Sequence, residues 1–150
     1  MIDNSKIFNE FKINKYIKDL KPGDKNLDMK FILIDKRQKT KTKNDSVIQQ
    51  YLVADETGSV LCNFFDDFGN FINDGDICLI KNGYASLFKN NLILYASNIS
   101  IIIARTGTGQ VVKIDEFFFN FSEQPNMSLV PWKRAKDDKG NESYVRDYEK

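Results

Sequence analysis

IQQYLVADETGSVLCNFF, residues 48–65, is the stretch that decides the fold class. It holds two β-rich runs joined by Asp55-Glu56-Thr57-Gly58, which is a turn sequence typical of a hairpin. Positions in the second run alternate between two faces, with Val60, Cys62 and Phe64 on one and Leu61, Asn63 and Phe65 on the other. Because Phe65 shares its face with the polar Asn63, we expect its ring to point away from the core.

Further short runs have the same β-strand character. They cover Leu27 to Asp35, Ile77 to Lys81, and Leu92 to Tyr95. Turn signals such as Asn73 to Asp76 and Lys89 to Asn91 separate them. Short strands at intervals of about eight to twelve residues predict an all-β domain, either a small barrel or a sandwich.

Length and composition limit the possible functions. The 150 residues suit one domain plus a tail, and the net charge is only +1, so any nucleic-acid site must be local. Cys62 and Cys78 lack the paired spacing of a zinc site and are expected to be buried thiols. No apolar run approaches the roughly twenty residues that a membrane span needs. We therefore expect a soluble intracellular protein with no metal site and no cofactor.

Aromatic and cationic residues gather in two places. Tyr84, Phe88 and Tyr95, with Lys89, lie on a strand-turn-strand segment, a pattern that suits stacking on unpaired bases. Upstream, residues 36–43 hold five cations and no acid, and Arg37, Lys39, Lys41 and Lys43 recur at every second position. In an extended hairpin this spacing predicts a one-sided row that can follow a phosphate backbone. The alternatives are ordinary core or surface aromatics and a solvated charged loop.

Catalysis is not supported by the residue pattern. The chain has no histidine, which removes the commonest general base and metal ligand. Asp66 and Asp67 are adjacent, so on a strand they would project to opposite faces. Thr106-Gly107-Thr108-Gly109 lacks the lysine and the strand-to-helix context of a phosphate-binding loop. We therefore expect a protein that is not an enzyme.

Several motifs in order along the chain resemble one known family. They are Tyr16-Ile17-Lys18-Asp19-Leu20-Lys21-Pro22-Gly23, Val53-Ala54-Asp55-Glu56-Thr57-Gly58-Ser59, Asp66-Asp67-Phe68-Gly69-Asn70, Gly83-Tyr84-Ala85-Ser86, Lys113-Ile114-Asp115-Glu116-Phe117 and Ser122-Glu123-Gln124-Pro125-Asn126. Together they are similar to the DNA-binding subunits of the SOSS complex, a family of human-type single-stranded DNA-binding proteins with a single OB fold. The resemblance covers about residues 16 to 126.

The resemblance implies a five-stranded OB barrel at residues 16–126, after an N-terminal extension at 1–15 and before a short polar tail at 127–150. It implies binding of single-stranded DNA in the nucleus, in the DNA damage response and repair. The family's base-stacking aromatics fall at Phe65, Tyr84, Phe88 and Tyr95. At the first position the family usually has tryptophan, so the smaller phenylalanine should stack more weakly. The segment matching Glu116 and Phe117 implies docking to a large helical scaffold subunit associated with the Integrator complex.

Two alternatives stay open. The domain could be an OB-fold assembly subunit of a telomere, replication or Integrator-linked complex. It could also bind single-stranded RNA, since every base has a π face. The lone tryptophan, Trp132, is a candidate docking residue, although a tail aromatic that folds back on the barrel is the favoured interpretation.

Overall fold

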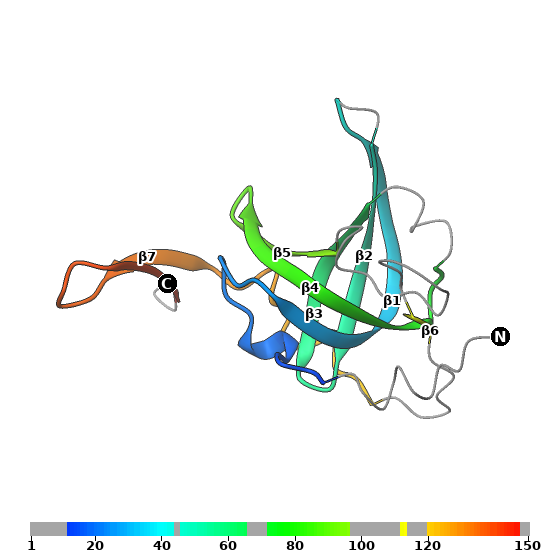
Figure 1. Cartoon of the computed structure of the whole chain (residues 1–150), viewed down its shortest axis with the longest axis horizontal. Helices are drawn as coiled ribbons and strands as arrows, with labels where there is room; N and C mark the ends of the chain where they lie inside the picture. Colours follow the sequence, from blue (N-terminus) through cyan, green and yellow to red (C-terminus); the bar gives the residue numbers. More distant parts are fainter. Residues whose placement is uncertain (1–11, 44–45, 66–71, 97–111, 114–119, 148–150) are drawn as a thin grey trace.

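The computed structural model describes residues 12–43, 46–65, 72–96, 112–113 and 120–147. Nearly all of the regular structure is β (Figure 1). The elements are η1 (Ile17–Asp19), β1 (Leu27–Lys41), β2 (Val47–Asp55), β3 (Gly58–Phe65), β4 (Ile77–Phe88), β5 (Asn91–Ala96), β6 (Val112–Lys113), β7 (Trp132–Lys136) and β8 (Glu142–Arg146). Within the described ranges, no helix is long and apolar enough to cross a membrane.

Strand β1 closes the barrel because it is long enough to pair with two neighbours. Its first half pairs antiparallel with β4 and its second half with β2. Strand β3 pairs antiparallel with β2 and parallel with β5, and β5 pairs antiparallel with β4. The closed order β1-β2-β3-β5-β4-β1 is that of an OB fold, so the predicted five-stranded OB barrel is confirmed. Strand β6 extends the sheet beside β4, at Cys78 and Leu79.

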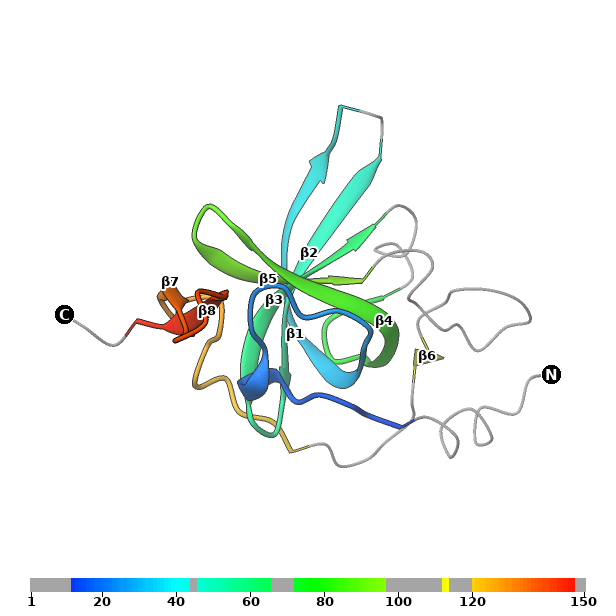
Figure 2. The ribbon, with the colours of Figure 1, turned by 60° about the vertical axis from the view of Figure 1, so that its left-hand side comes forward.

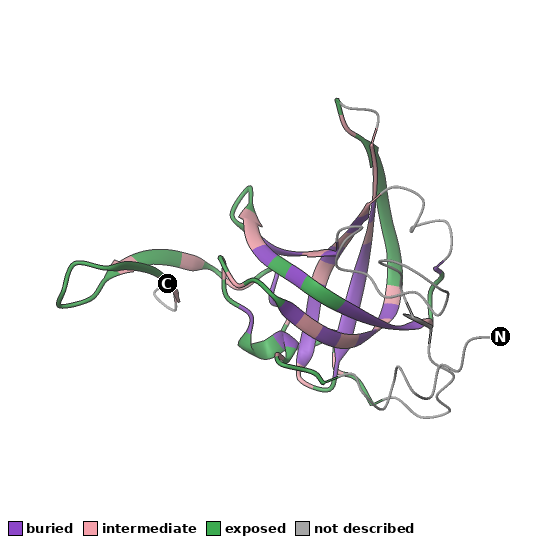
Figure 3. Cartoon of the chain, viewed as in Figure 1, coloured by how far each residue is buried: buried purple, intermediate pink, exposed green. Residues whose placement is uncertain are grey.

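Alternation along the strands fills the barrel interior, which Figure 3 shows as buried stripes. Val60, Cys62 and Phe64 are fully buried in one core cluster, as the pattern of β3 predicts. The Phe64 ring meets those of Phe31 and Tyr51 edge to face, with centroids 6.3 and 5.9 Å away. Cys62 and Cys78 are both buried, as predicted, and burial raises the pKa of Cys62 well above its usual value.

One buried carboxylate joins three segments at the end of the barrel that holds the β2–β3 turn. Asp55 Oδ2 accepts the backbone N–H of Ile17, and Oδ1 accepts the N–H and hydroxyl of Thr57. The carbonyl oxygen of Asp55 accepts the N–H of Ser122. Charge-assisted hydrogen bonds of this kind are roughly twice as strong as neutral ones. Asp55 therefore fastens both the segment before β1 and the segment after residue 120 to this end of the barrel.

The segment after residue 120 completes the seam between β3 and β5. Ser59 N–H donates to the carbonyl of Pro125, and Met127 N–H donates to the carbonyl of Ser59. Ser128 is buried, and its hydroxyl accepts the N–H of Leu61 at 2.8 Å and donates to the carbonyl of Leu92 at 2.6 Å. The Ser128 hydroxyl thus bridges the two strands just before their own parallel pairing begins at Leu61 and Ile93.

The segment predicted to be a polar tail, residues 127–150, contains regular structure. Met127 is fully buried in the barrel core, one residue beyond the predicted domain boundary. Strands β7 and β8 then form a hairpin that projects away from the barrel (Figures 1 and 2). Trp132, at the start of β7, packs against the core, which confirms that this aromatic folds back on the barrel. At the other end of the chain, Ile7, Phe8 and Phe11 of the predicted extension lie outside the described residues.

Replacement of Ser128 by alanine should destabilise the barrel by about 1–3 kcal/mol, because it leaves the part-buried N–H of Leu61 and the buried carbonyl of Leu92 without this partner. Urea denaturation measures the change in unfolding free energy. The control is Ser143→Ala on the exposed part of β8, expected to stay within about 0.5 kcal/mol of the parent. Equal effects of the two substitutions would contradict this role of Ser128.

Candidate nucleic-acid interface

Three of the predicted stacking residues form a ladder of rings on the outside of the barrel. Tyr84 of β4 pairs directly with Tyr95 of β5, and their rings stack with centroids 4.8 Å apart and planes 10° apart. Phe65 of β3 lies on the other side of Tyr95, with centroids 6.2 Å apart and planes 23° apart. We call Phe65, Tyr95 and Tyr84 the aromatic ladder. It exists because the parallel pairing of β3 with β5 places Asn63 opposite Tyr95, two residues before Phe65.

The ladder is accessible to a ligand. Tyr84 keeps 40% of its surface exposed, while Phe65 and Tyr95 are half-buried. The predicted outward orientation of Phe65 is confirmed, since the neighbouring Phe64 lies in the core. Burial, and then the nearby Tyr84, raises the pKa of Tyr95. The Tyr95 phenol is therefore neutral at physiological pH and does not repel phosphate.

An amide pair adds polar groups beside the ladder. Gln50 of β2 lies opposite Asn63 of β3, and its Nε2 donates to Asn63 Oδ1 at 2.9 Å. Amides of this type can exchange such a bond for hydrogen bonds to base edges. Sequence reasoning missed Gln50 as a site residue. The sequence contained the information needed to find it. The turn between Asp55 and Gly58 fixes the register of the hairpin, and this register places Gln50 opposite Asn63.

The remaining predicted ring lies at the tip of the β4–β5 hairpin. Phe88 is 58% exposed, and the Lys89 ammonium lies 5.4 Å from its ring centroid. Lys89 and Asn90 both have positive φ, 51° and 69°, as a two-residue hairpin turn of type I′ requires. Phe88 and Lys89 thus form a separate contact point at one side of the ladder, as a ring with an adjacent cation.

The predicted basic residues lie on the projecting β1–β2 hairpin, but in two directions. Lys39 pairs with Gln49 and Lys41 with Val47, so both share one face. A register shift between Lys36 and Lys39 inserts an extra residue opposite β2. Arg37 lies within this bulge and forms a 2.9 Å ion pair with Asp35. The predicted single row is therefore wrong for Arg37. Lys43 follows β1 in the exposed turn.

A buried glutamine holds the bulge in place. The amide of Gln49 is on the inner side of β2, and its Nε2 donates to the carbonyl oxygens of Arg37, Gln38 and Gln50 at 3.0, 3.3 and 3.1 Å. Carbonyls displaced from a regular strand ladder need such partners when buried. Gln49, which the sequence did not single out, thereby stabilises the bulge from which the basic hairpin continues.

The chain shares its overall fold with a solved structure of low sequence identity. No protein-family model matches the chain. The chain is similar to the solution structure of a hypothetical protein from Arabidopsis thaliana, with 22% identity and a TM-score of 0.60 over 86% of this chain and 92% of that one. Another similar structure is the second OB-fold domain of replication protein A from Methanococcus maripaludis, with 15% identity and a TM-score of 0.49. The match covers 69% of this chain and 97% of that domain. The resemblance to the DNA-binding subunits of SOSS stays a prediction. The predicted docking residues Glu116 and Phe117 lie outside the described residues.

Substitution of Gln49 by leucine should destabilise the protein by about 1–3 kcal/mol, because the side chain keeps its approximate volume but no longer satisfies the bulge carbonyls. Amide hydrogen exchange at residues 36–41 should accelerate more than exchange elsewhere in the barrel. The matched control is Gln38→Leu, at an exposed position of the same hairpin. Uniform acceleration across all strands would show that Gln49 does not act locally on the bulge.

Proposed function

We propose that this protein binds single-stranded DNA across the aromatic ladder. The observation that carries the proposal is the stack of Tyr84, Tyr95 and Phe65 on the outer face of an OB barrel. OB folds bind oligonucleotides on the face of strands β2 and β3 and with the β1–β2 and β4–β5 loops. Here Phe65 and the amide pair lie on β2 and β3, the ladder continues onto β5 and β4 through Tyr95 and Tyr84, and the two projecting hairpins correspond to the two loops.

Ring geometry favours unpaired bases over duplex. Only a base that has left a duplex stack offers an apolar face to a side chain. The Tyr84 and Tyr95 rings are 4.8 Å apart, while a base between two rings needs about 7 Å, twice the carbon–carbon contact distance. A base therefore adds to the exposed side of Tyr84 instead of entering between the two tyrosines.

Positive charge supports this site locally. Lys39 and Lys41 share one face of the β1–β2 hairpin, and Lys89 lies at the tip of the β4–β5 hairpin. The whole chain has a net charge of only +1. Phosphate contacts are thus confined to the two hairpins, and stacking supplies most of the affinity at physiological salt.

The cellular role is proposed on the family resemblance. We propose that the protein acts in the nucleus, in the DNA damage response, as part of a SOSS-like complex. Docking to a large helical scaffold subunit through Glu116 and Phe117 belongs to the same proposal. Single-stranded RNA is the alternative ligand for the ladder.

The first test compares single strands with duplex. If about three to five of Arg37, Lys39, Lys41, Lys43 and Lys89 contact phosphates, log affinity should fall against log salt with a slope of about −2 to −3.5, at roughly −0.7 per phosphate. Fluorescence anisotropy of labelled oligo-dT, oligo-U and duplex DNA over a salt series measures this. Equal or tighter binding of duplex of the same length would refute the proposal, and preference for oligo-U would assign the ladder to RNA.

The second test compares rings with charges. Tyr84→Ala and Phe88→Ala should each weaken oligo-dT binding by about five- to a hundredfold with little change in salt slope, since stacking contributes about 1–3 kcal/mol per base. Tyr95→Ala should weaken binding over the same range, because the Tyr95 ring supports the rings of Tyr84 and Phe65 on either side of it. Lys41→Ala should instead reduce the slope by about 0.7 and cost less affinity. Phe65→Trp should tighten binding, because the larger ring extends the ladder.

Tyr16→Ala is the matched control for the ring substitutions. Tyr16 is 43% exposed, close to the 40% of Tyr84, but lies at the Asp55 end of the barrel, beside Ile17. Its removal should leave oligo-dT affinity unchanged. If Tyr84→Ala behaved like Tyr16→Ala, the ladder would not be the binding surface.

A further inference from the structure

The aromatic ladder has two ends, and the end at Phe65 faces β2. In the sheet, β2 and β3 are neighbours, followed by β5 and β4. The Tyr84 and Tyr95 centroids are 4.8 Å apart, which matches the usual spacing of about 4.7–4.9 Å between neighbouring strands. These rings therefore stack in the direction that crosses the strands. Since Tyr95 lies on one side of Phe65, a further ring added on the other side lies above β2.

Ile48 and Gln50 form the floor of this position beyond Phe65. Ile48 is directly opposite Phe65 in the β2–β3 register, and Gln50 is opposite Asn63. Side chains two residues apart on a strand point to the same face, so all four share the outer face of the barrel. All four are half-buried, which leaves part of each side chain accessible to a ligand. The position thus has an aromatic ring at its side, with an apolar residue and an amide beneath it.

The amide pair keeps several hydrogen-bonding groups for a ligand. Gln50 Nε2 donates to Asn63 Oδ1 at 2.9 Å, and across the described ranges this is the only hydrogen bond that either side chain makes. Gln50 thus retains its carbonyl oxygen and one N–H, and Asn63 retains both hydrogens of Nδ2. The bond also positions these groups, because it holds the Gln50 amide between β2 and β3, next to the position beyond Phe65.

We propose that the side of Phe65 opposite Tyr95 forms, with the amide pair, a subsite that reads the Watson–Crick edge of an unpaired base. A base stacked on Phe65 lies about 3.5–4 Å from the ring, which is less than one strand spacing, so its edge comes within reach of the Gln50 amide. For thymine, N3–H donates to Gln50 Oε1 and a neighbouring carbonyl oxygen accepts an amide N–H. This inference rests on the proposed binding of single-stranded DNA and adds hydrogen bonding to stacking.

A base edge suits this subsite better than a phosphate does. A phosphate has acceptors only, so it leaves the Gln50 carbonyl oxygen without a donor. A Watson–Crick edge has a donor beside an acceptor and therefore complements both groups of the amide. In a duplex this edge is already paired, and only an unpaired base presents it to a side chain. Hydrogen bonding at the subsite thus excludes duplex DNA by a second route, in addition to stacking.

N3-methylthymidine tests the subsite, because its methyl group replaces the only donor on the Watson–Crick edge of thymine and leaves the ring and the phosphates in place. Fluorescence anisotropy compares labelled oligo-dT with the same oligonucleotide built from N3-methylthymidine, at one salt concentration. We expect the parent protein to bind the methylated strand at least about fivefold more weakly, which corresponds to the loss of one or two hydrogen bonds.

A double variant and a matched control locate the effect. Gln50→Met with Asn63→Leu removes both amides at similar side-chain size and leaves neither partner unpaired. This variant should bind the two oligonucleotides within about twofold of each other. Gln124→Met also removes an exposed amide, but near Ser122 at the Asp55 end of the barrel, and it should keep the preference for unmodified oligo-dT.

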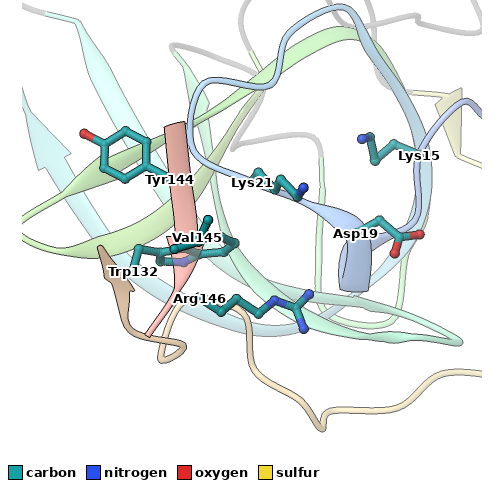
Figure 4. Close-up of a pocket in the computed structure, with 7 residues that line it drawn as sticks. All are labelled: Lys15, Asp19, Lys21, Trp132, Tyr144, Val145 and Arg146. Carbon is teal, nitrogen blue, oxygen red and sulfur yellow. The ribbon is translucent and has the colours of Figure 1, made fainter. Parts of the chain in front are cut away.

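Trp132 checks that each variant is folded, because it is the chain's lone tryptophan and packs against the barrel core. It lines a pocket of about 440 Å³ beside the C-terminal hairpin, and no residue of β2 or β3 lines that pocket (Figure 4). Trp132 emission should therefore be the same in the parent, the double variant and the control.

Equal binding of the two oligonucleotides by the parent overturns the inference, as does a folded double variant that keeps the preference. The proposed function survives either result if Tyr84→Ala still weakens oligo-dT binding, because that substitution removes the other end of the ladder. If the parent does not bind oligo-dT, the proposed function fails and the inference fails with it.

Discussion

The parallel pairing of β3 with β5 is the constraint on which the site depends. It joins only residues 61–64 to residues 93–96, yet it closes the barrel and places Phe65 beside Tyr95. If this seam opened, Tyr84 and Tyr95 would remain neighbours through the β4–β5 hairpin, but Phe65 would leave the ladder. Ser128 reinforces the seam from a distant part of the chain by bridging Leu61 and Leu92. The chain after residue 120 is therefore part of the barrel's closure and supports the outer face indirectly.

The two ends of the β2–β3 hairpin have different roles. One end holds the hydrogen bonds that fasten the barrel together, and the other carries the outward-facing groups of the candidate interface. At the turn between these strands, Asp55 holds Ile17, Thr57 and Ser122 by hydrogen bonds to one buried residue. At the far ends of the same strands lie Gln50 and the half-buried Phe65. A buried carboxylate with several donors is costly to disturb, while exposed rings can vary with little effect on folding. Substitutions at the outer rings should therefore affect the fold less than substitutions at Asp55.

The sequence predicted the features that depend on local pattern. Alternation in residues 59–65 correctly assigned Phe64 to the core and Phe65 to the outside, because side-chain direction has a period of two in any strand. The bulge at Arg37 and Gln38 was missed, since it depends on the buried amide of Gln49 on another strand. The β7–β8 hairpin was missed because its strands are highly charged and are anchored through Trp132, a tertiary contact. Contacts between rings of β3 and β5 also required the nonlocal pairing.

Preorganisation differs across the interface, and this difference bears on how a strand would bind. The rings of Tyr84 and Tyr95 already stack on one another, so most of their rotamer entropy is lost during folding. A base that adds to this stack need not order the side chains that hold it, which increases the net gain from each contact. Phe88, by contrast, is the most exposed of the four predicted rings and lies at a hairpin tip. The conformational entropy of the Phe88 side chain is therefore lost on binding and not on folding. In the proposed DNA complex, the ladder would therefore supply the preorganised part of the contact, and Phe88 would be ordered around it.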